Sequence, residues 1–415
     1  MARAELIRVF RWLVCIVGVS SAVIALTGTP ARADEIRDAQ WHLSFLRVAE
    51  IHEITRGEGV TVAVIDTGVD ASHPDLAGNV LPGLDFVTGG DGRADSDGHG
   101  TAMASLIAGH GHGDGNTDGV LGLAPEANIL PVRVQPGDAS EADEWEAEGG
   151  EIAEGIRWAV NQGARVINIS LSTRRSIELQ EALEYALERN VVVITAAGNT
   201  TLGDQEVDGL GTFPGALVVS GTDRQGFFSP VSVRGDQVAL AAPAEEIMAA
   251  GAGHDYYTSR GTSNATALVS AAAALVISEY PELDAANVIN RLIQTADDRG
   301  PSGRDMEYGF GVVDPLAALT EDVEPVDENP LGTGPGLEPP EETPGSPPAP
   351  PEEAAAGVGG GVLALIGVAI AGGIVSLVLF LIWRTRRARR HHTFNPPPPP
   401  PVNTQASSHR SPWAP

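Results

Sequence analysis

The stretches VAVIDTG (62–68), DGHGT (97–101) and GTS (261–263) supply a carboxylate, an imidazole and a hydroxyl, in this order along the chain. Each of these side chains stands beside glycine or another small residue, which lets the backbone turn tightly and exposes the functional group. Asp66, His99 and Ser263 are the residue types of a serine nucleophile system, in which the hydroxyl attacks, the imidazole moves a proton and the carboxylate orients the imidazole. The three stretches therefore predict hydrolytic chemistry.

The order of the three residues carries further information. Serine proteases that share this geometry on unrelated folds place the residues in different orders. The order Asp, His, Ser is that of subtilisins, and the three motifs with their flanks resemble the subtilase family over roughly residues 57–319. This resemblance implies a serine endopeptidase with Asp66, His99 and Ser263 as its catalytic triad.

Strand-like and helix-like runs alternate between residues 59 and 320. Helix-like runs have apolar residues three or four positions apart, as at Ile152, Ile156 and Ala159. This alternation predicts an α/β fold with a mostly parallel sheet and helices on both faces, in the three layers typical of subtilisins. In such sheets sites form at the carboxyl ends of strands, which is where Asp66 stands. The expected strands are Val62–Ile65, Ile129–Val134, Val166–Leu171, Val191–Thr195, Leu217–Ser220 and Val238–Ala241.

Both His99 and Ser263 are expected at the start of a helix. Small residues follow His99, and an alanine-rich run from Asn264 to Ser278 follows the serine. The partial positive charge of a helix N-terminus would favour an oxyanion beside Ser263.

The resemblance also assigns residues that would bind the substrate. Asn199, which follows the strand-like run 191–195, takes the place of an asparagine whose amide points into the oxyanion hole; a simple turn cap is the alternative. Ser170, Leu171 and Ser172 would form the rim along which an extended substrate lays its backbone, and Ser172 stands where the family usually has glycine.

The N-terminal residues 1–33 are expected to be a secretory signal. Arginines precede the apolar run 12–26, and Ala31-Arg32-Ala33 offers small residues for a signal peptidase. A retained N-terminal anchor is the alternative. Residues 34–58 form an extension that is too short for the inhibitory propeptide domain of many secreted subtilases.

The C-terminal part contains three segments with different compositions. Residues 321–356 are a proline-rich acidic linker, residues 357–383 are a predicted transmembrane helix without charge, and residues 384–415 are a basic, proline-rich tail. The arginines after the helix place the tail in the cytoplasm and the protease domain, residues 59–320, outside it. We therefore expect a single-pass protein of the cell membrane.

Composition excludes some partners. The 415 residues carry a formal net charge of −29, although both ends are basic, so the part between them is more acidic than the whole. This charge argues against nucleic acid as a ligand of the ectodomain. The single cysteine, Cys15, lies in the predicted signal, so the mature chain would contain no disulfide.

Several weaker patterns leave alternatives open. No cofactor is required by the predicted chemistry, but Asp75 and Asn116 fall where subtilisins build a calcium site. His110, His112 and Asp114 suggest either a transition-metal site or a solvated glycine-rich loop. The acidic run 138–154 is either a solvated insertion or a surface that attracts a basic substrate segment.

Within the subtilases, the whole architecture resembles the mycosins, the membrane-anchored proteases of type VII secretion systems. The strings AQWHL (39–43), LPVRV (130–134) and YGFGVVDP (308–315) agree with this. The resemblance implies limited cleavage of secreted proteins and association with the secretion membrane complex. Two alternatives remain, namely a surface-anchored degradative subtilase and a mainly structural subunit of the complex.

Overall fold

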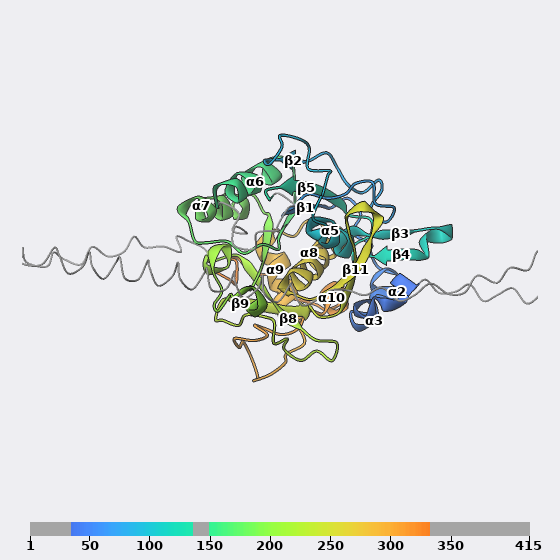
Figure 1. The fold of residues 1–415 in the computed structure, drawn as a ribbon. Coiled ribbons are helices and arrows are strands. Elements are labelled where there is room, and N and C mark those ends of the chain that lie inside the picture. Colours follow the sequence, from blue (N-terminus) through green and yellow to red (C-terminus); the bar gives the residue numbers. More distant parts are fainter. Residues whose placement is uncertain (1–34, 136–148, 333–415) are drawn as a thin grey trace, which may run out of the picture. The chain divides into compact units, whose positions relative to one another are not determined.

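The computed structural model describes residues 35–135 and 149–332 (Figure 1). Its centre is a seven-stranded sheet in the order β2-β5-β1-β6-β7-β8-β9, in which all neighbouring strands are parallel. All six runs predicted as strands lie in this sheet, so the expected parallel α/β architecture is confirmed. The strands are β1 (Thr61–Asp66), β2 (Leu84–Asp85), β5 (Asn128–Arg133), β6 (Val166–Ile169), β7 (Val192–Ala196), β8 (Leu217–Thr222) and β9 (Val238–Pro243).

Two helical layers enclose the sheet. Because side chains alternate along a strand, Ala63 and Ile65 pack against α6 and α7, while Val62 and Val64 face the opposite core, which contains α5, α8 and α9. Figure 1 shows α6 and α7 together, apart from α8 and α9. Burying each large aliphatic side chain contributes about 1.5–3 kcal/mol. The helices are α5 (His99–Ala108), α6 (Gly149–Asn161), α7 (Ile177–Leu187), α8 (Thr262–Glu279), α9 (Ala285–Gln294) and α10 (Pro315–Thr320).

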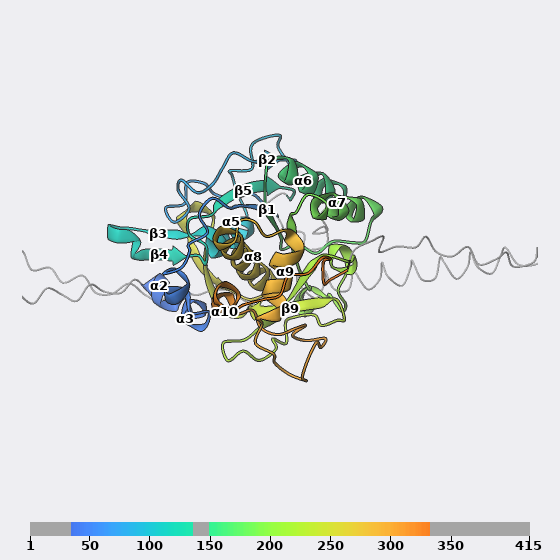
Figure 2. The same cartoon turned by 180° about the vertical axis from the view of Figure 1, so that it is seen from behind.

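The N-terminal extension folds onto the protease domain as three short helices, α2 (Glu35–Ala39), α3 (Trp41–Phe45) and α4 (Val48–Ile51). Both ribbon views place α2 beside the hairpin of β3 (His110–His112) and β4 (Asp118–Leu121) (Figure 2). The side-chain amide of Gln40 pairs with the backbone of Leu121 at 2.9 and 3.0 Å. The extension is therefore an integral part of the described fold.

A second hairpin, formed by β10 (Ile247–Ala250) and β11 (Tyr256–Ser259), precedes the helix that carries Ser263. Neither hairpin is among the predicted elements, because β3 and β11 are short and partly polar. The remaining single turns are the 3-10 helices η1 (Asp114–Asn116), η2 (Thr200–Leu202), η3 (Gly209–Thr212) and η4 (Ala252–His254).

Candidate active site

Asp66 and His99 meet at the carboxyl end of β1. Asp66 is the last residue of this strand and is fully buried, and His99 is the first residue of α5. The distance between Nδ1 of His99 and Oδ1 of Asp66 is 2.8 Å, which is a hydrogen bond. The structure thus brings together two residues that only motif reasoning had connected.

Gly100 permits this close approach of α5 to β1. A Cβ atom at position 100 would lie 2.0 Å from the carbonyl oxygen of Gly68 and 3.1 Å from Cβ of Asp66. Gly68 has a φ of 99°, in the left-handed region that glycine adopts without strain. The small residues of both motifs therefore set the distance between carboxylate and imidazole.

Asp95, which sequence reasoning missed, holds the two motifs in place. Its Oδ2 accepts hydrogen bonds from the N–H and the hydroxyl of Thr101, at 3.0 and 2.6 Å, and its Oδ1 accepts one from the hydroxyl of Thr67 at 3.0 Å. The Thr67 hydroxyl in turn accepts the N–H of Gly100 at 2.9 Å. A carboxylate at a helix start satisfies free N–H groups there and complements the helix dipole. The sequence signal that could have identified Asp95 is its place as an acidic residue shortly before the start of a helix.

The electrostatic surroundings of His99 favour its protonated form. Burial alone would lower the pKa of His99, but the charge of Asp66 and its hydrogen bond, together with the charges of Asp97 and Asp95, raise that pKa to about 9. Asp97 also accepts the N–H of His99 at 3.1 Å. The imidazole is therefore surrounded by three carboxylates.

Ser263 is the second residue of α8, which is expected to start here, and Gly261 directly precedes the helix. Its hydroxyl donates to the carbonyl of Ser170 at 3.2 Å, and the hydroxyl of Ser170 donates to the carbonyl of Ser263, also at 3.2 Å. In the described part of the chain no hydrogen bond joins Ser263 to His99, so the hydroxyl has to turn before His99 can take its proton. Contacts of this kind are often loose in a protease without substrate.

Asn199 lies next to the start of α8. Its Oδ1 accepts the N–H of Thr262 at 2.9 Å and the hydroxyl of Thr262 at 3.2 Å. Because these bonds fix the oxygen end of the amide, they also fix the direction of its N–H₂ end. Thr262 is thus a positioning residue that sequence reasoning missed, although it belongs to the third motif.

Asp204 contacts both substrate-binding segments predicted from the sequence, and it was not itself predicted. Its Oδ2 accepts the N–H of Asn199 at 2.7 Å and the hydroxyl of Ser172 at 3.3 Å. Leu171, between Ser170 and Ser172, is buried. The loop that carries Asp204 contains no recognisable motif, so only the structure reveals that Asp204 contacts both segments.

A buried polar chain leads from the sheet to α8. Ser270 donates to Oδ1 of Asn168 at 3.0 Å, and Nδ2 of Asn168 donates to the hydroxyl of Ser170 at 3.1 Å. Asn168 and Ser270 are fully buried. Through Ser170, this chain connects the inside of the sheet with Ser263.

Tyr257 extends from the hairpin β10–β11 toward the start of α5, where its hydroxyl donates to the carbonyl of Gly98 at 3.3 Å. Burial raises the pKa of Tyr257, and the charges of Asp66, Asp97 and Asp95 raise it further. The Tyr257 hydroxyl therefore stays protonated and neutral beside His99.

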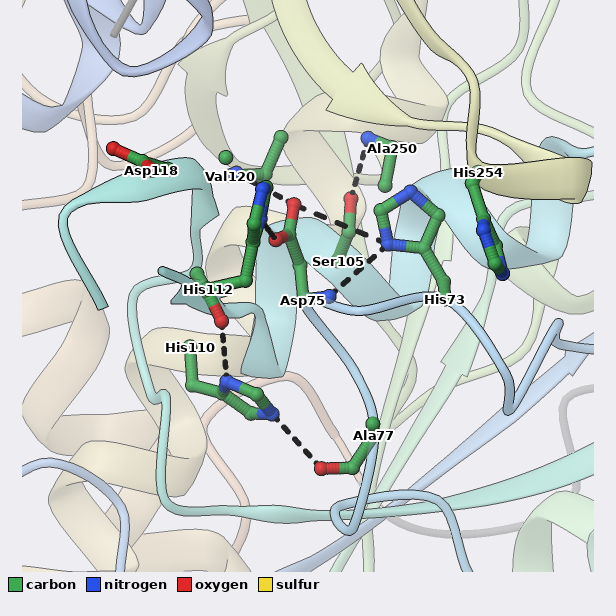
Figure 3. Close-up of polar contacts among 12 residues, drawn as sticks. His73, Asp75, Ala77, Ser105, His110, His112, Asp118, Val120, Ala250 and His254 are labelled. Carbon is green, nitrogen blue, oxygen red and sulfur yellow. Dashed lines mark hydrogen bonds and ion pairs between the residues drawn. The ribbon is translucent and has the colours of Figure 1, made fainter. Parts of the chain in front are cut away.

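Figure 3 shows the surroundings of Asp75, one of the two residues predicted to hold calcium. The buried carboxylate accepts a hydrogen bond from Nδ1 of His112 at 2.6 Å and one from the N–H of Val120 at 2.7 Å. Asn116 lies in the loop before Val120, and its carbonyl accepts a hydrogen bond from the guanidinium of Arg37 at 3.3 Å. Protein donors thus face both oxygens of Asp75, and calcium binding here stays a prediction.

The alternative transition-metal group includes His110 and His112. Besides the contact of His112 with Asp75, the ring nitrogens of His110 lie 2.7 and 3.0 Å from the carbonyl oxygens of Gly111 and Ala77 (Figure 3). Across residues 35–135 and 149–332, no group of three or more histidine, cysteine, aspartate or glutamate side chains has the arrangement of a metal site.

The predicted membrane segments lie outside the described residues. Within the ranges 35–135 and 149–332, no helix is both long and apolar enough to cross a bilayer. The predicted signal 1–33, most of the linker, the predicted span 357–383 and the tail are all outside these ranges, and they stay predictions.

Comparison with protein families agrees with this geometry. The model of the subtilase family matches residues 57–311. Mycosin-1 of Mycobacterium tuberculosis (strain ATCC 25618 / H37Rv) is 36% identical over 355 residues, which cover 73% of this chain and 78% of that protein. Thermitase of Thermoactinomyces vulgaris is 36% identical over 253 residues, which cover 61% of this chain and 86% of thermitase.

Comparison with solved structures also finds similarity to a protease of a type VII secretion system. The serine protease MycP1, described as an essential component of the type VII (ESX-1) secretion system, superimposes with a TM-score of 0.59 at 36% identity. The match covers 71% of this chain and 91% of the MycP1 chain. The fold and about a third of the matched sequence are therefore shared with known proteases.

Proposed function

Since this chain belongs to the subtilase family, in its mycosin branch, we propose that it is a serine endopeptidase that cleaves peptide bonds with Asp66, His99 and Ser263. The observation that carries the proposal is the hydrogen bond between Asp66 and His99 at the carboxyl end of β1. Ser263, with its neighbours Ser170 and Asn199, supplies the rest of the site.

In this mechanism, Ser263 turns its hydroxyl from the carbonyl of Ser170 toward His99 and attacks the scissile carbonyl carbon. His99 takes the hydroxyl proton and later gives it to the leaving amine, while Asp66 holds the imidazole in the required tautomer and stabilises its charged form. Water then attacks the acyl carbon while His99 takes a proton from it. The bond between this carbon and Oγ of Ser263 breaks, and His99 returns the proton to Oγ.

The oxyanion would be stabilised by Asn199 and by the start of α8. With Oδ1 held by Thr262, the N–H₂ group of Asn199 is free to donate to the negative oxygen of the tetrahedral intermediate. Ser263 is the second residue of α8, so the partial positive charge of the helix N-terminus acts on the same oxygen. The segment 170–172 would bind the extended substrate backbone.

Labelling with a fluorophosphonate tests this assignment, because such a probe reacts with an activated serine. We expect the full-length protein to be labelled on Ser263, and Ser263→Ala to abolish labelling. Ser44→Ala, on the short helix α3, serves as the matched control and should be labelled like the unmodified protein. Labelling of the Ser263→Ala variant would contradict the proposal.

We further propose that the enzyme is anchored in the cell membrane through residues 357–383, with the protease domain outside the cytoplasm. The similarity to mycosin-1 and to MycP1 supports limited cleavage of proteins secreted by a type VII system and association with that system's membrane complex. In a host that carries the system, Ser263→Ala should abolish processing of a secreted protein. Unchanged processing would contradict this role, and rapid cleavage of casein without sequence preference would favour a degradative protease.

One observation favours a structural role as the second candidate. In the described part of the chain the hydroxyl of Ser263 bonds to Ser170 and not to His99, so His99 does not activate it in this arrangement. If stabilising the complex is the main task, secretion should persist with Ser263→Ala and fail when the whole chain is deleted. Equal failure in both strains would reject the structural role.

A further inference from the structure

Two segments contact the start of α8, which carries Ser263. Ser170, after β6, exchanges two hydrogen bonds with Ser263, and Asn199, after β7, binds the N–H of the preceding Thr262. Because β6 and β7 are neighbouring parallel strands, their carboxyl ends lie side by side. An acyl group on Ser263 therefore starts close to both segments.

Among the residues of a bound peptide, the one whose carbonyl is attacked has the least freedom to change its position. Its carbonyl carbon must reach Oγ of Ser263, and its oxygen must reach the amide of Asn199. Its side chain branches from the atom next to this carbonyl carbon, so it starts close to the segments that follow β6 and β7. A charged group that touches both segments will act on this side chain first.

Asp204 is such a group. Its Oδ2 binds the N–H of Asn199 in one segment and the hydroxyl of Ser172 in the other. A Cβ atom at Gly198 would lie 3.0 Å from this same oxygen, so the carboxylate lies directly on the backbone beside the oxyanion residue. The side chain is half-buried. Within the described ranges both hydrogen bonds of the carboxylate are accepted by Oδ2, whereas Oδ1 has no hydrogen-bond partner and the carboxylate has no ion pair.

We propose that Asp204 makes the enzyme select arginine or lysine at the substrate position whose carbonyl Ser263 attacks. This inference rests on the proposed function, because it assigns a preference to the same site. Oδ1 is available to a cationic side chain, and a carboxylate accepts a guanidinium or ammonium group through strong charge-assisted hydrogen bonds. Arg175, close in sequence to Ser172, stacks over the ring of Phe213 at 5.5 Å.

The charges around the site act in the same direction. Asp95 and Asp97 lie close enough to His99 to raise the pKa of the imidazole, so the His99 side of the site is also negative. A basic substrate segment is attracted by this arrangement and an acidic one is repelled. The contact between the Asp204 carboxylate and a basic side chain then decides which substrate residue is placed at the scissile bond.

Asp204 has an alternative, purely structural role, since it also holds the backbone of Asn199. A loss of this role would slow all substrates equally, whereas a loss of charge recognition would slow only those with a basic residue. Asp204→Asn separates the two, because the amide oxygen still accepts the N–H of Asn199 while the negative charge is removed. Glu206→Gln removes the same charge from an exposed position of the same loop and serves as the control.

The experiment uses two peptidyl phosphonate esters that differ only at the residue next to the phosphorus, which is arginine in one and citrulline in the other. Citrulline has nearly the shape of arginine but no charge. With the full-length protein we expect the arginine probe to label Ser263 about 10- to 100-fold faster, the range of one charge-assisted hydrogen bond. Asp204→Asn should reduce this ratio to about twofold or less without slowing the citrulline probe, and Glu206→Gln should keep it.

Three outcomes overturn the assignment. Equal labelling of the unmodified protein by both probes shows that no charge recognition exists at this position. Equal slowing of both probes by Asp204→Asn shows that Asp204 only positions the loop of Asn199. An equal fall in the ratio with Glu206→Gln shows a general effect of charge. Absence of labelling by these probes and by a simple fluorophosphonate would refute the proposed function as well.

Discussion

The backbone N–H of Thr262 donates to Oδ1 of Asn199 at 2.9 Å, across 63 positions of the sequence. This bond connects the residue before Ser263, the proposed nucleophile, to the residue proposed for the oxyanion hole. Because Asp204 holds the N–H of Asn199 from the other side, the orientation of this asparagine is fixed at both its backbone and its side chain. The donor is therefore oriented before substrate arrives, which is what electrostatic stabilisation of a transition state requires.

Asn199→Ala should lower kcat by about 100- to 1000-fold and change KM much less, because the amide binds the transition state rather than the bound substrate. The measurement is steady-state hydrolysis of a peptide. Thr201→Ala, at an exposed position two residues on, should leave kcat unchanged. A fall of less than about threefold with Asn199→Ala would remove this residue from the oxyanion hole.

The pH profile of the enzyme should reflect the carboxylates around His99. Only neutral imidazole can accept the proton of Ser263, and the pKa of His99 is raised to about 9, so kcat/KM should rise with pH up to about 9. Asp97→Asn removes one of the charges that raise this pKa, and the rise of kcat/KM should then move to lower pH. The profile of kcat/KM between pH 6 and about 10.5 measures both effects.

Asp91→Asn is the matched control for this experiment. Asp91 lies shortly before Asp97 in the chain and is paired with Arg93 at the surface. Its loss should leave the profile of kcat/KM unchanged. If Asp91→Asn and Asp97→Asn move the profile equally, the local contact of Asp97 with His99 is not the cause.

Ser270→Ala should destabilise the protein by about 1–3 kcal/mol, because Oδ1 of Asn168 would stay buried without its donor. Thermal denaturation measures the loss. Ser278 lies on the same helix, but its hydroxyl is only half-buried and donates to an exposed carbonyl, so Ser278→Ala should cost clearly less. Equal losses for the two variants would show that the chain through Asn168 has no special role.

His42 should make the protein less stable in mild acid. Both ring nitrogens are buried without a hydrogen-bond partner in the described part of the chain, and burial lowers the pKa of His42 from 6.5 to about 3. Between these values the unfolded chain binds a proton that the folded chain does not, so stability falls as pH drops below about 6.5. From pH 7 to 5 the expected loss is about 2 kcal/mol.

His42→Leu removes this titration. The free energy of unfolding, measured in denaturant at pH 7 and pH 5, should then depend less on pH than in the unmodified protein by about 2 kcal/mol. An unchanged dependence would show that His42 is hydrated or paired in solution. A general loss of stability at both pH values would not affect this comparison, because the test lies in the difference.

The sheet was predictable because its strands are buried on both faces and are therefore rich in branched residues over short runs. The main boundary error shows the limit of this signal. Val166–Leu171 is predicted as one strand, but β6 ends at Ile169, because Ser170 leaves the sheet to bind Ser263. Ser170 is compatible with a strand by residue type, but its contact with a residue 93 positions away places it outside the sheet.

Only those residues of the candidate site that lie in short sequence motifs could be predicted from the sequence. Asp66, His99, Ser263 and Asn199 each follow or open an element within a few residues, so a local pattern identifies them. Asp204 binds groups from separate segments, and no local pattern marks an acid in a loop as such a partner. Asp95 stands shortly before a helix start, which is a local signal, but its bond to Thr67 in another segment follows only from the fold.

The sequence by itself determined the order of the carboxylate, imidazole and hydroxyl, the parallel α/β architecture and the family. These properties reside in runs of a few residues, where residue type and spacing restrict the backbone directly. Only the tertiary structure decided that Ser263 rests against Ser170, that Thr262 orients Asn199 and that Asp204 joins the segments after β6 and β7. These contacts depend on distances between the ends of neighbouring parallel strands, which exist only once the sheet has formed.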